Sequence, residues 1–300
     1  MDFTKCERVE DYAYGCAGGN KIAVRHQDKI YMLKFPPSPK SGNVTLSYTN
    51  SCISEHIGCL VFRSVGINAQ ETMLGEYRTG TGKTRLVCAC LDFTQNNKSL
   101  IDFISTKNSV VDSESNGTST ERETVIDAIM KQKKVDAAKL LAFYYDIFVV
   151  DALLGNFDRH NGNFGLLYDK SKNSFEIAPI YDCGSCLLPQ ADDDALQFYL
   201  DNRGEFNSRI FNFPQSAIRV NGKKINYYDY INSMQDEELN RALLRVVPKI
   251  DFVTIDKIIN DTPYISDIRK DFYSKYMKQR FEYILRPSFE ALNSQGEHIK

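Results

Sequence analysis

The sequence predicts an α+β fold with two lobes, a small sheet-rich lobe followed by a larger, mainly helical lobe. In the first third of the chain, apolar residues gather in short runs separated by turn residues, whereas from about residue 99 they recur at helical spacing. A chain of 300 residues is long enough for two lobes of ordinary size. We therefore expect residues 1–93 to form the small lobe and residues 94–300 the large lobe.

The small lobe is expected to be an antiparallel sheet with one helix. Residues 21–26 and 30–35 predict two strands around a tight turn, and residues 69–77 and 85–93 predict a second pair. Residues 50–65 have apolar side chains at helical spacing. Each of these segments is bounded by turn residues or proline, which supports separate short elements.

The large lobe is predicted to be built mainly from helices. Residues 122–131 and 136–154 are helix candidates, and a long helix is expected near residues 264–292. Residues 164–168 and 174–180 predict a short hairpin between them. The polar tract that precedes the first of these helices, from Ser109 to Arg122, has little to bury, so we expect a mobile surface loop there.

Composition excludes several classes of protein. Hydrophobic residues make up 42% of the chain and charged residues 25%, as in soluble globular proteins. The net charge of −2 supplies no basic field, so direct binding of nucleic acid is not expected. No run of apolar residues is long enough for a membrane span, so no membrane partner is expected either.

Cysteine usage and the N-terminal segment predict the cellular compartment. The eight cysteines are scattered, and the N-terminal residues lack the layout of a cleaved signal peptide. We therefore expect cytoplasmic synthesis with reduced thiols. Export as an effector by a route without a cleaved signal peptide stays open.

The motif NFDRHNGN, residues 156–163, carries the strongest chemical signal. It places Asp158 five positions before Asn163, and a second acid, Asp182, follows a short hairpin and stands two positions before Gly184. Phosphoryl transfer to a hydroxyl uses one carboxylate at the hydroxyl, and an amide and a second carboxylate to hold magnesium on the phosphates. The interval is that of the kinase pattern. We predict catalytic roles for Asp158, Asn163 and Asp182, with Asn163 and Asp182 as Mg²⁺ ligands.

Two charged residues of the small lobe complete the expected phosphate site. Lys34 stands between apolar residues on a predicted strand, and Glu55 stands on the helix that follows. Kinases pair a strand lysine with a helix glutamate to hold the α- and β-phosphates of ATP. The sequence therefore predicts a Lys34–Glu55 ion pair at the nucleotide.

The remaining nucleotide contacts are expected from two loops. A glycine-rich run before the first strand contains Gly18 and Gly19, whose backbone N–H groups can approach phosphate oxygens closely, and Lys21 can add a charge. Adenine is expected against the connection at residues 90–93, where Asp92 is the candidate contact. We expect the neighbours of Asp158 in the motif, Arg159 and His160, to brace the loop by hydrogen bonds.

Two other motifs are weaker. Residues 79–84, TGTGKT, resemble the end of a Walker A loop, but Tyr77 stands where that pattern needs glycine and a strand follows instead of a helix. A hairpin tip explains the segment better. The pair Cys183 and Cys186 could be redox-active or could bind zinc, but a zinc site needs two further ligands at a matching spacing.

The chain resembles the HipA-like serine/threonine kinases. The family hallmarks appear here as NFDRHNGN and APIYD, and the segments KFPP, ETMLGEY and IAPIYDCGSCLLPQ are also similar, closest to the compact, cell-translocating type of the family. The resemblance implies a protein-kinase-like fold and an ATP- and Mg²⁺-dependent protein kinase that autophosphorylates on Ser or Thr. It also implies that Asp158 is catalytic, that Asn163 and Asp182 bind metal, and that Lys34 contacts ATP.

Two alternative functions stay open. Phosphoinositide kinases share a DRHxxN run, so a lipid kinase is one alternative, and a pseudokinase that works as an interaction module is the other. For a protein kinase the expected partner is a protein substrate with a reactive Ser or Thr. The sequence leaves open whether a further partner is an antitoxin or a host target.

Overall fold

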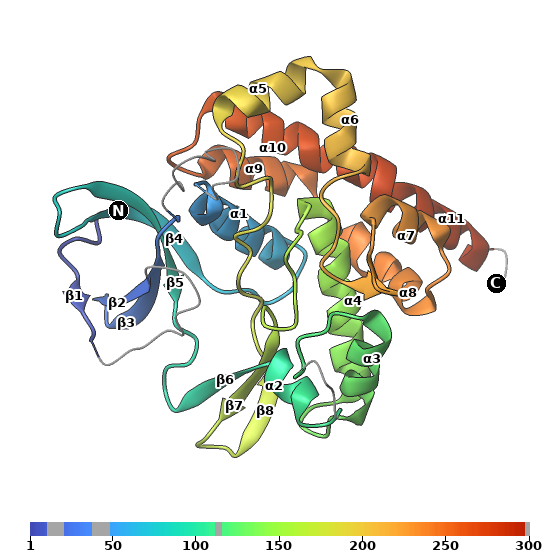
Figure 1. The fold of residues 1–300 in the computed structure, drawn as a ribbon, viewed down its shortest axis with the longest axis horizontal. Coiled ribbons are helices and arrows are strands. Elements are labelled where there is room, and N and C mark those ends of the chain that lie inside the picture. The colour runs from blue at the N-terminus through green and yellow to red at the C-terminus, as the bar shows by residue number, and fades with distance from the viewer. Residues whose placement is uncertain (11–20, 38–48, 112–115, 298–300) are drawn as a thin grey trace.

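The computed structural model describes residues 1–10, 21–37, 49–111 and 116–297 of the chain. Figure 1 shows a sheet-rich part formed by the N-terminal third, with helices gathered on the other side of the molecule. This arrangement confirms the predicted α+β class and the order of its two parts. The boundary between residues 93 and 94 stays a prediction.

The N-terminal part contains a five-stranded antiparallel sheet with strand order β1-β2-β3-β5-β4. Its strands are β1 (Glu7–Arg8), β2 (Lys21–His26), β3 (Lys29–Lys34), β4 (Thr72–Arg78) and β5 (Thr84–Leu91). Both predicted strand pairs are confirmed, although β4 begins three residues later than expected. Residues 79–83 form the tip of the β4–β5 hairpin, so the Walker-like run is a turn.

Helix α1 (Ser51–Ser64) joins the sheet to the helical part. It contacts β4 and β5 on one side, and α4 (Ala137–Leu154) and α9 (Phe252–Asp261) on the other. Ile53, Ile57 and Val61 recur at a spacing of four and are buried, which explains why this segment is helical. Burying each such side chain contributes about 1.5–3 kcal/mol, so α1 is fixed against both parts.

The rest of the chain is mainly helical, as predicted. The remaining described α-helices are α2 (Phe103–Asn108), α3 (Arg122–Lys131), α5 (Asp193–Asp201), α6 (Arg203–Phe211), α7 (Tyr227–Ser233), α8 (Glu237–Val246), α10 (Asp267–Arg280) and α11 (Arg286–Glu297), and a short 3-10 helix, Val247–Lys249, follows α8. The long helix expected near residues 264–292 is present from Asp267, but it is interrupted by a π-helical turn, Phe281–Leu285.

Two small sheets complete the fold. One has the order β6-β7-β8, with β6 (Lys98–Asp102), β7 (Gly165–Asp169) and β8 (Ser174–Ile177), and the other pairs β9 (Arg219–Val220) with β10 (Lys223–Lys224). The predicted hairpin is confirmed as β7–β8. Strand β6 was expected to lie in a helical region; it pairs along its whole length with β7, more than sixty positions later, a partner that local spacing cannot reveal.

In the tract from Ser109 to Arg122, the described residues 109–111 and 116–120 form turns and irregular chain, with Ser109, Asn116 and Thr118 exposed, as expected of a surface loop. Residues 112–115 lie outside the described residues. The buried Asn161 side chain donates hydrogen bonds of 2.8 Å to the carbonyls of Gly117 and Ser119. The buried Lys107 ammonium donates a third bond, 2.6 Å long, to the Ser119 carbonyl. The described end of the tract is therefore held in place by its neighbours.

A search of the described residues finds no helix with the length and apolar character that a membrane crossing requires.

Candidate active site

Helix α4 leads directly into the motif loop. The Asp136 side chain caps its first turn by accepting from the Lys139 N–H, and Gly155 ends it with φ of 63°. A Cβ atom at Gly155 would lie 2.1 Å from the Tyr276 hydroxyl oxygen, so only glycine fits both the backbone angle and the space. The chain then turns at Asn156 into the loop that carries Asp158.

The buried side chain of Arg159 holds this loop in place. Its guanidinium pairs with the buried carboxylate of Asp151 in α4, with Nε 3.0 Å from Oδ2. Its Nη1 donates to the carbonyl oxygens of Asn163, at 2.9 Å, and Tyr181, at 2.6 Å. One buried side chain therefore fixes the loop of Asp158 and Asn163 against the segment that precedes Asp182.

Further hydrogen bonds set the shape of the loop itself. The Gly162 N–H donates to Nδ1 of His160 at 3.0 Å, and the Asn163 Nδ2 donates to the Asp158 carbonyl at 2.8 Å. The Tyr181 hydroxyl donates to the Gly162 carbonyl at 2.9 Å. These contacts and those of Arg159 confirm that Arg159 and His160 brace the loop.

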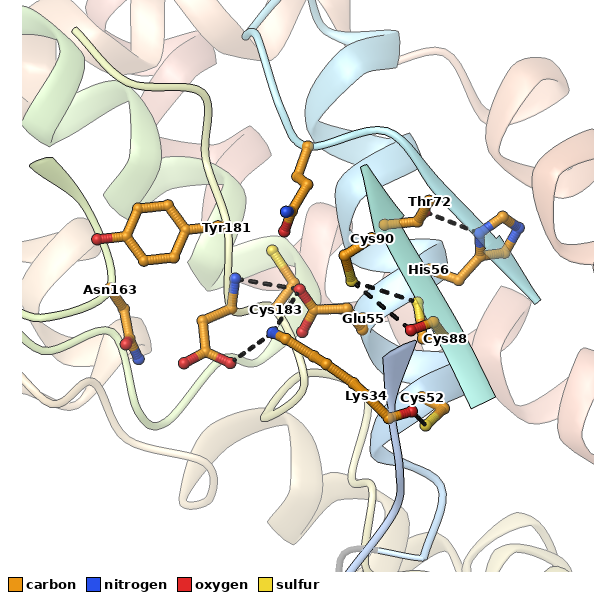
Figure 2. A network of polar contacts seen from close by, with 12 residues as sticks. Lys34, Cys52, Glu55, His56, Thr72, Cys88, Cys90, Asn163, Tyr181 and Cys183 are labelled. Carbon is orange, nitrogen blue, oxygen red and sulfur yellow. Dashed lines mark hydrogen bonds and ion pairs between the residues drawn. The ribbon is translucent and has the colours of Figure 1, made fainter. Parts of the chain in front are cut away.

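Lys34 of β3 contacts Asp182, one of the two candidate metal ligands. Its Nζ lies 3.0 Å from Glu55 Oε1 and 3.0 Å from Asp182 Oδ1, so the predicted Lys34–Glu55 pair is present. Figure 2 shows Lys34 extending toward Glu55, with Asn163 and Tyr181 on the other side of the same network. The Asp182 N–H also donates to Glu55 Oε1, at 3.1 Å. Glu55 thus positions both the lysine and the backbone of Asp182.

The backbone of Asp182 is held in an unusual conformation. Its φ of 59° lies in the left-handed region, which costs a non-glycine residue roughly 1–3 kcal/mol. The bonds from Asp182 to Glu55 and Lys34 offset that cost. Strain that is maintained by surrounding contacts is typical of functional sites.

The charges in this network are strongly perturbed. The charge of Lys34 is the largest influence on Asp182 and lowers its pKa to about 2, although burial acts in the opposite direction. This carboxylate is therefore ionised. Burial would lower the pKa of Lys34, but Asp182 and Glu55 raise it well above its usual value. Burial raises the pKa of the Glu55 carboxyl, against the charge of Lys34. Perturbations of this kind gather at functional sites.

Asp158 is exposed at the surface of the loop and interacts with Asp182. Partial burial of the Asp158 carboxyl group raises its pKa. His160 opposes this shift, and the negative charge of Asp182 adds to it. The two carboxylates therefore lie within electrostatic reach of each other. A like charge nearby raises a carboxyl pKa, which favours its use as a proton acceptor.

The other candidate residues are placed as follows. Gly18 and Gly19 lie outside the described residues, so the glycine loop stays a prediction. Lys21 begins β2 directly opposite Lys34 of β3, and its charge also lowers the pKa of Asp182. Asp92 follows β5; its Oδ1 accepts from the Thr94 N–H at 2.7 Å, and its contact with a nucleotide stays a prediction.

The residues present fit a magnesium ion. Asn163 uses its Nδ2 for the Asp158 carbonyl, so its amide oxygen is the atom that would serve a metal. Nearly half of the Asp182 side chain, 47%, remains accessible although Oδ1 contacts Lys34. An amide oxygen and an ionised carboxylate suit a hard cation that keeps several waters. Among the described residues, His, Cys, Asp and Glu form no group of three or more suited to a metal.

The thiols of Cys59, Cys183 and Cys186 interact with one another next to Asp182. Cys183 is fully buried, and Arg159 Nη2 donates to its Sγ at 3.4 Å. Burial alone would raise the pKa of Cys183, but hydrogen bonds from the Cys186 and Cys59 thiols, together with Arg159, hold it well below its usual value. The cysteines that the structure describes are all free.

Sequence reasoning missed the role of Asp151. An acid inside the apolar run of α4 was an available signal, because a charge that a helix buries needs a partner. It also did not connect Lys224 of β10 with Asp158, although the charge of Lys224 lowers the pKa of Asp158 against the effect of burial. No spacing in the sequence connects Lys224 to residue 158, because only folding brings the β9–β10 hairpin close to the loop.

Comparison with known proteins agrees with this geometry. The model of a family described as the HipA-like C-terminal domain matches residues 15–249. The serine/threonine-protein kinase CtkA of Helicobacter pylori is 45% identical over 281 residues, covering 93% of this chain and 85% of that protein. The crystal structure of the Helicobacter pylori proinflammatory kinase CtkA aligns with a TM-score of 0.91 at 42% identity, over 98% of both chains.

A more distant structure shares the fold. It is a chain of the Shewanella oneidensis toxin–antitoxin complex of HipA, HipB and operator DNA, with a TM-score of 0.55 and 14% identity, covering 94% of this chain and 67% of that one. At that identity the likeness is one of fold alone. The family match over most of the chain and the identity with CtkA confirm the resemblance that the motifs indicated, and this chain belongs to the HipA-like C-terminal domain family.

Proposed function

We propose that this chain, a HipA-like serine/threonine protein kinase, transfers the γ-phosphate of ATP to a Ser or Thr hydroxyl with the help of Mg²⁺, and that it autophosphorylates. The observation that carries the proposal is the pair of ion contacts from Lys34 to Glu55 and Asp182, each 3.0 Å long, beside the loop of Asp158 and Asn163. These are the groups that phosphoryl transfer requires, contributed by separate parts of the chain.

Each residue has a distinct task in the proposed reaction. Asp158 orients the acceptor hydroxyl and takes its proton. Lys34 supplies positive charge for the phosphates, and Glu55 keeps its ammonium in place. Asn163 and Asp182 would hold Mg²⁺ through oxygen atoms, and the ion would neutralise charge on the phosphates during transfer. Arg159 keeps the two loops at a fixed separation through the carbonyls it contacts.

Substitution of Asp158 tests the catalytic assignment. Asp158→Asn should reduce incorporation of labelled phosphate from ATP by about 10²–10⁴-fold while nucleotide binding persists. Asp127→Asn, on the exposed face of α3, is the matched control and should keep wild-type transfer. Normal transfer by Asp158→Asn would contradict the assignment.

A second substitution tests the metal site. Asp182→Ala should abolish the part of nucleotide binding that depends on Mg²⁺, measured by calorimetry with and without the ion. Unchanged Mg²⁺-dependent binding would contradict the role of Asp182. Intact-mass measurement after incubation with ATP and Mg²⁺ tests autophosphorylation, because each phosphate adds a fixed mass to the chain.

The alternatives are outcomes of the same assays. Transfer to phosphoinositides on thin-layer plates, without transfer to protein, would favour a lipid kinase. Binding of ATP without transfer to any acceptor would favour a pseudokinase. The partner that we propose is a protein substrate with an accessible Ser or Thr.

A further inference from the structure

The β9–β10 hairpin presents basic side chains on a chain whose net charge is −2. Arg219, Lys223 and Lys224 are exposed. The Arg219 guanidinium turns back to the Gly222 carbonyl, at 2.6 Å, so the two lysines carry the outward charge. No ion pair within the described part of the chain includes Lys223 or Lys224. Two such lysines can bind an anionic partner at little desolvation cost.

The hairpin lies within electrostatic reach of the motif loop. The rings of Phe157, next to Asp158, and Phe213 lie 5.8 Å apart. The Tyr227 hydroxyl, three positions after Lys224, donates to the Asn156 carbonyl at 2.6 Å. The segments that flank the hairpin therefore pack on the loop of Asp158, whose carboxylate we propose to contact the acceptor hydroxyl, and Lys224 acts electrostatically on Asp158. Lys34, in contrast, contacts Asp182 directly, with Nζ 3.0 Å from Oδ1, and Lys21 stands opposite Lys34 on the neighbouring strand. The cations are thus divided between two sides. Lys34 and Lys21 serve the proposed phosphate side, and Lys224 serves the acceptor side.

Hydrogen bonds attach the hairpin firmly to the motif loop. Asn161 of the motif donates to the carbonyls of Gly117 and Ser119, each at 2.8 Å. At the next residue, the Thr120 carbonyl accepts from the Arg219 N–H at 3.0 Å, and the Thr120 hydroxyl donates to the Ala217 carbonyl at 2.7 Å. The segment 117–120 therefore links the two, and this fixes the position of the lysines.

Glu121, whose carboxylate contacts the turn of the β9–β10 hairpin, does not pair with either lysine. The Glu121 carboxylate accepts from the Gly222 N–H, with Oε2 at 3.1 Å and Oε1 at 3.4 Å. It is occupied by the backbone of the turn and holds the hairpin against the start of α3. Its contact contributes to the fixed position of Lys223 and Lys224 without pairing with either.

We propose that the β9–β10 hairpin selects protein substrates that carry acidic side chains next to the phosphoacceptor Ser or Thr, with Lys223 and Lys224 as the specificity-determining residues. This inference rests on the proposed kinase function. A carboxylate held beside the acceptor would pair with a fixed ammonium, whereas a basic side chain there would be repelled. Because the lysines lie on the acceptor side, their effect falls on the protein substrate and leaves ATP binding unchanged.

The test uses the full chain and three Ser-containing peptide libraries that differ only in the flanking residues, which are Glu, Gln or Lys. The wild type should phosphorylate the Glu library with a kcat/KM about five- to tenfold above that of the Gln library. The double variant Lys223→Glu/Lys224→Glu should prefer the Lys library instead, through peptide KM and with KM for ATP unchanged. Lys223→Gln/Lys224→Gln should lose the preference without reversing it.

The control has the same change of charge elsewhere on the surface. Lys133→Glu/Lys170→Glu, at two exposed lysines away from the hairpin, should keep the wild-type preference. Equal use of the three libraries by the wild type, or an unchanged Glu preference in both hairpin variants, would overturn the inference while the kinase function stands. Absence of transfer by the wild type to any peptide or protein would overturn the proposed function and this inference together.

Discussion

Asp151 and Arg159 form an ion pair beneath the motif loop, and both side chains are almost completely buried. Asp151 also accepts from the Asn156 Nδ2 at 2.8 Å, so one carboxylate at the end of α4 holds both the start and the middle of the loop. Burial raises the pKa of Asp151, and Arg159 opposes that shift. The geometry of the site therefore depends on a residue that would touch neither nucleotide nor substrate.

Removing Asp151 should destabilise the whole protein. Asp151→Ala leaves the Arg159 guanidinium buried without its partner, which costs about 3–5 kcal/mol of the free energy of unfolding. Asp146→Ala is the control, since Asp146 lies on the same helix and pairs with the partly exposed Arg245; it should cost at most about 1 kcal/mol. Urea unfolding measures both. Equal losses in the two variants would show that the buried pair contributes no more to the free energy of unfolding than the Asp146–Arg245 pair.

Lys34 should matter far more than a second lysine on the same strand. Lys34→Ala removes the charge that contacts Asp182 and Glu55, and kcat/KM for ATP should fall by about 10²-fold or more. Lys29→Ala, at the exposed start of β3, should stay near the wild-type value. Steady-state kinetics with varied ATP makes the comparison, and comparable losses would argue against a phosphate role for Lys34.

Stability should fall on the acid side of neutral because of His56. Burial lowers the pKa of His56 from 6.5 to about 4, and its Nδ1 contacts the Thr72 hydroxyl at 2.9 Å. Between these two pKa values the unfolded chain binds a proton that the folded protein does not, so the free energy of unfolding decreases as pH falls through this window. The loss approaches about 3 kcal/mol at pH 4.

His56→Gln is the variant that isolates this effect. It keeps a polar side chain for Thr72 but cannot take up the proton. Urea unfolding at pH 7 and at pH 4.5 should therefore give a smaller difference for His56→Gln than for the wild type. If the two proteins lost stability in parallel, the acid sensitivity would belong to other groups.

Two glycine-to-alanine substitutions should have opposite effects. Gly155→Ala places a Cβ 2.1 Å from the Tyr276 hydroxyl oxygen at a φ of 63°, and should destabilise by about 2–4 kcal/mol. Gly204→Ala, in α6 with no atom near its Cβ position, should stabilise by up to about 1 kcal/mol. Thermal unfolding compares the two. Stabilisation by Gly155→Ala would show that the helix end can rearrange.

Local patterns in the sequence predicted the elements with strong periodicity. The residues of α1 and the β2–β3 hairpin appeared close to their observed limits because apolar spacing and turn residues are local signals. The Lys34–Glu55 pair was also predictable, since a strand lysine and a helix glutamate follow each other in the chain. The interval between Asp158 and Asn163 placed the motif on one loop.

Long-range contacts were not predictable in the same way. Strand β6 has only five residues, and its partner β7 lies far along the chain. The π-helical turn in the last long helix leaves the apolar spacing almost unchanged, so the interruption was invisible. The charge of Lys224 acts on Asp158 across more than sixty positions of sequence, a separation that no local pattern encodes.

The joint between the motif loop and the β9–β10 hairpin uses main-chain acceptors, the carbonyls of residues 117, 119 and 120. Because these acceptors belong to the backbone, deleting or inserting one residue would shift every acceptor out of register. The identity of Gly117 is also constrained, because a Cβ there would lie 2.4 Å from the Ile104 carbonyl oxygen. The length of this segment is therefore constrained more strictly than the identity of most of its side chains.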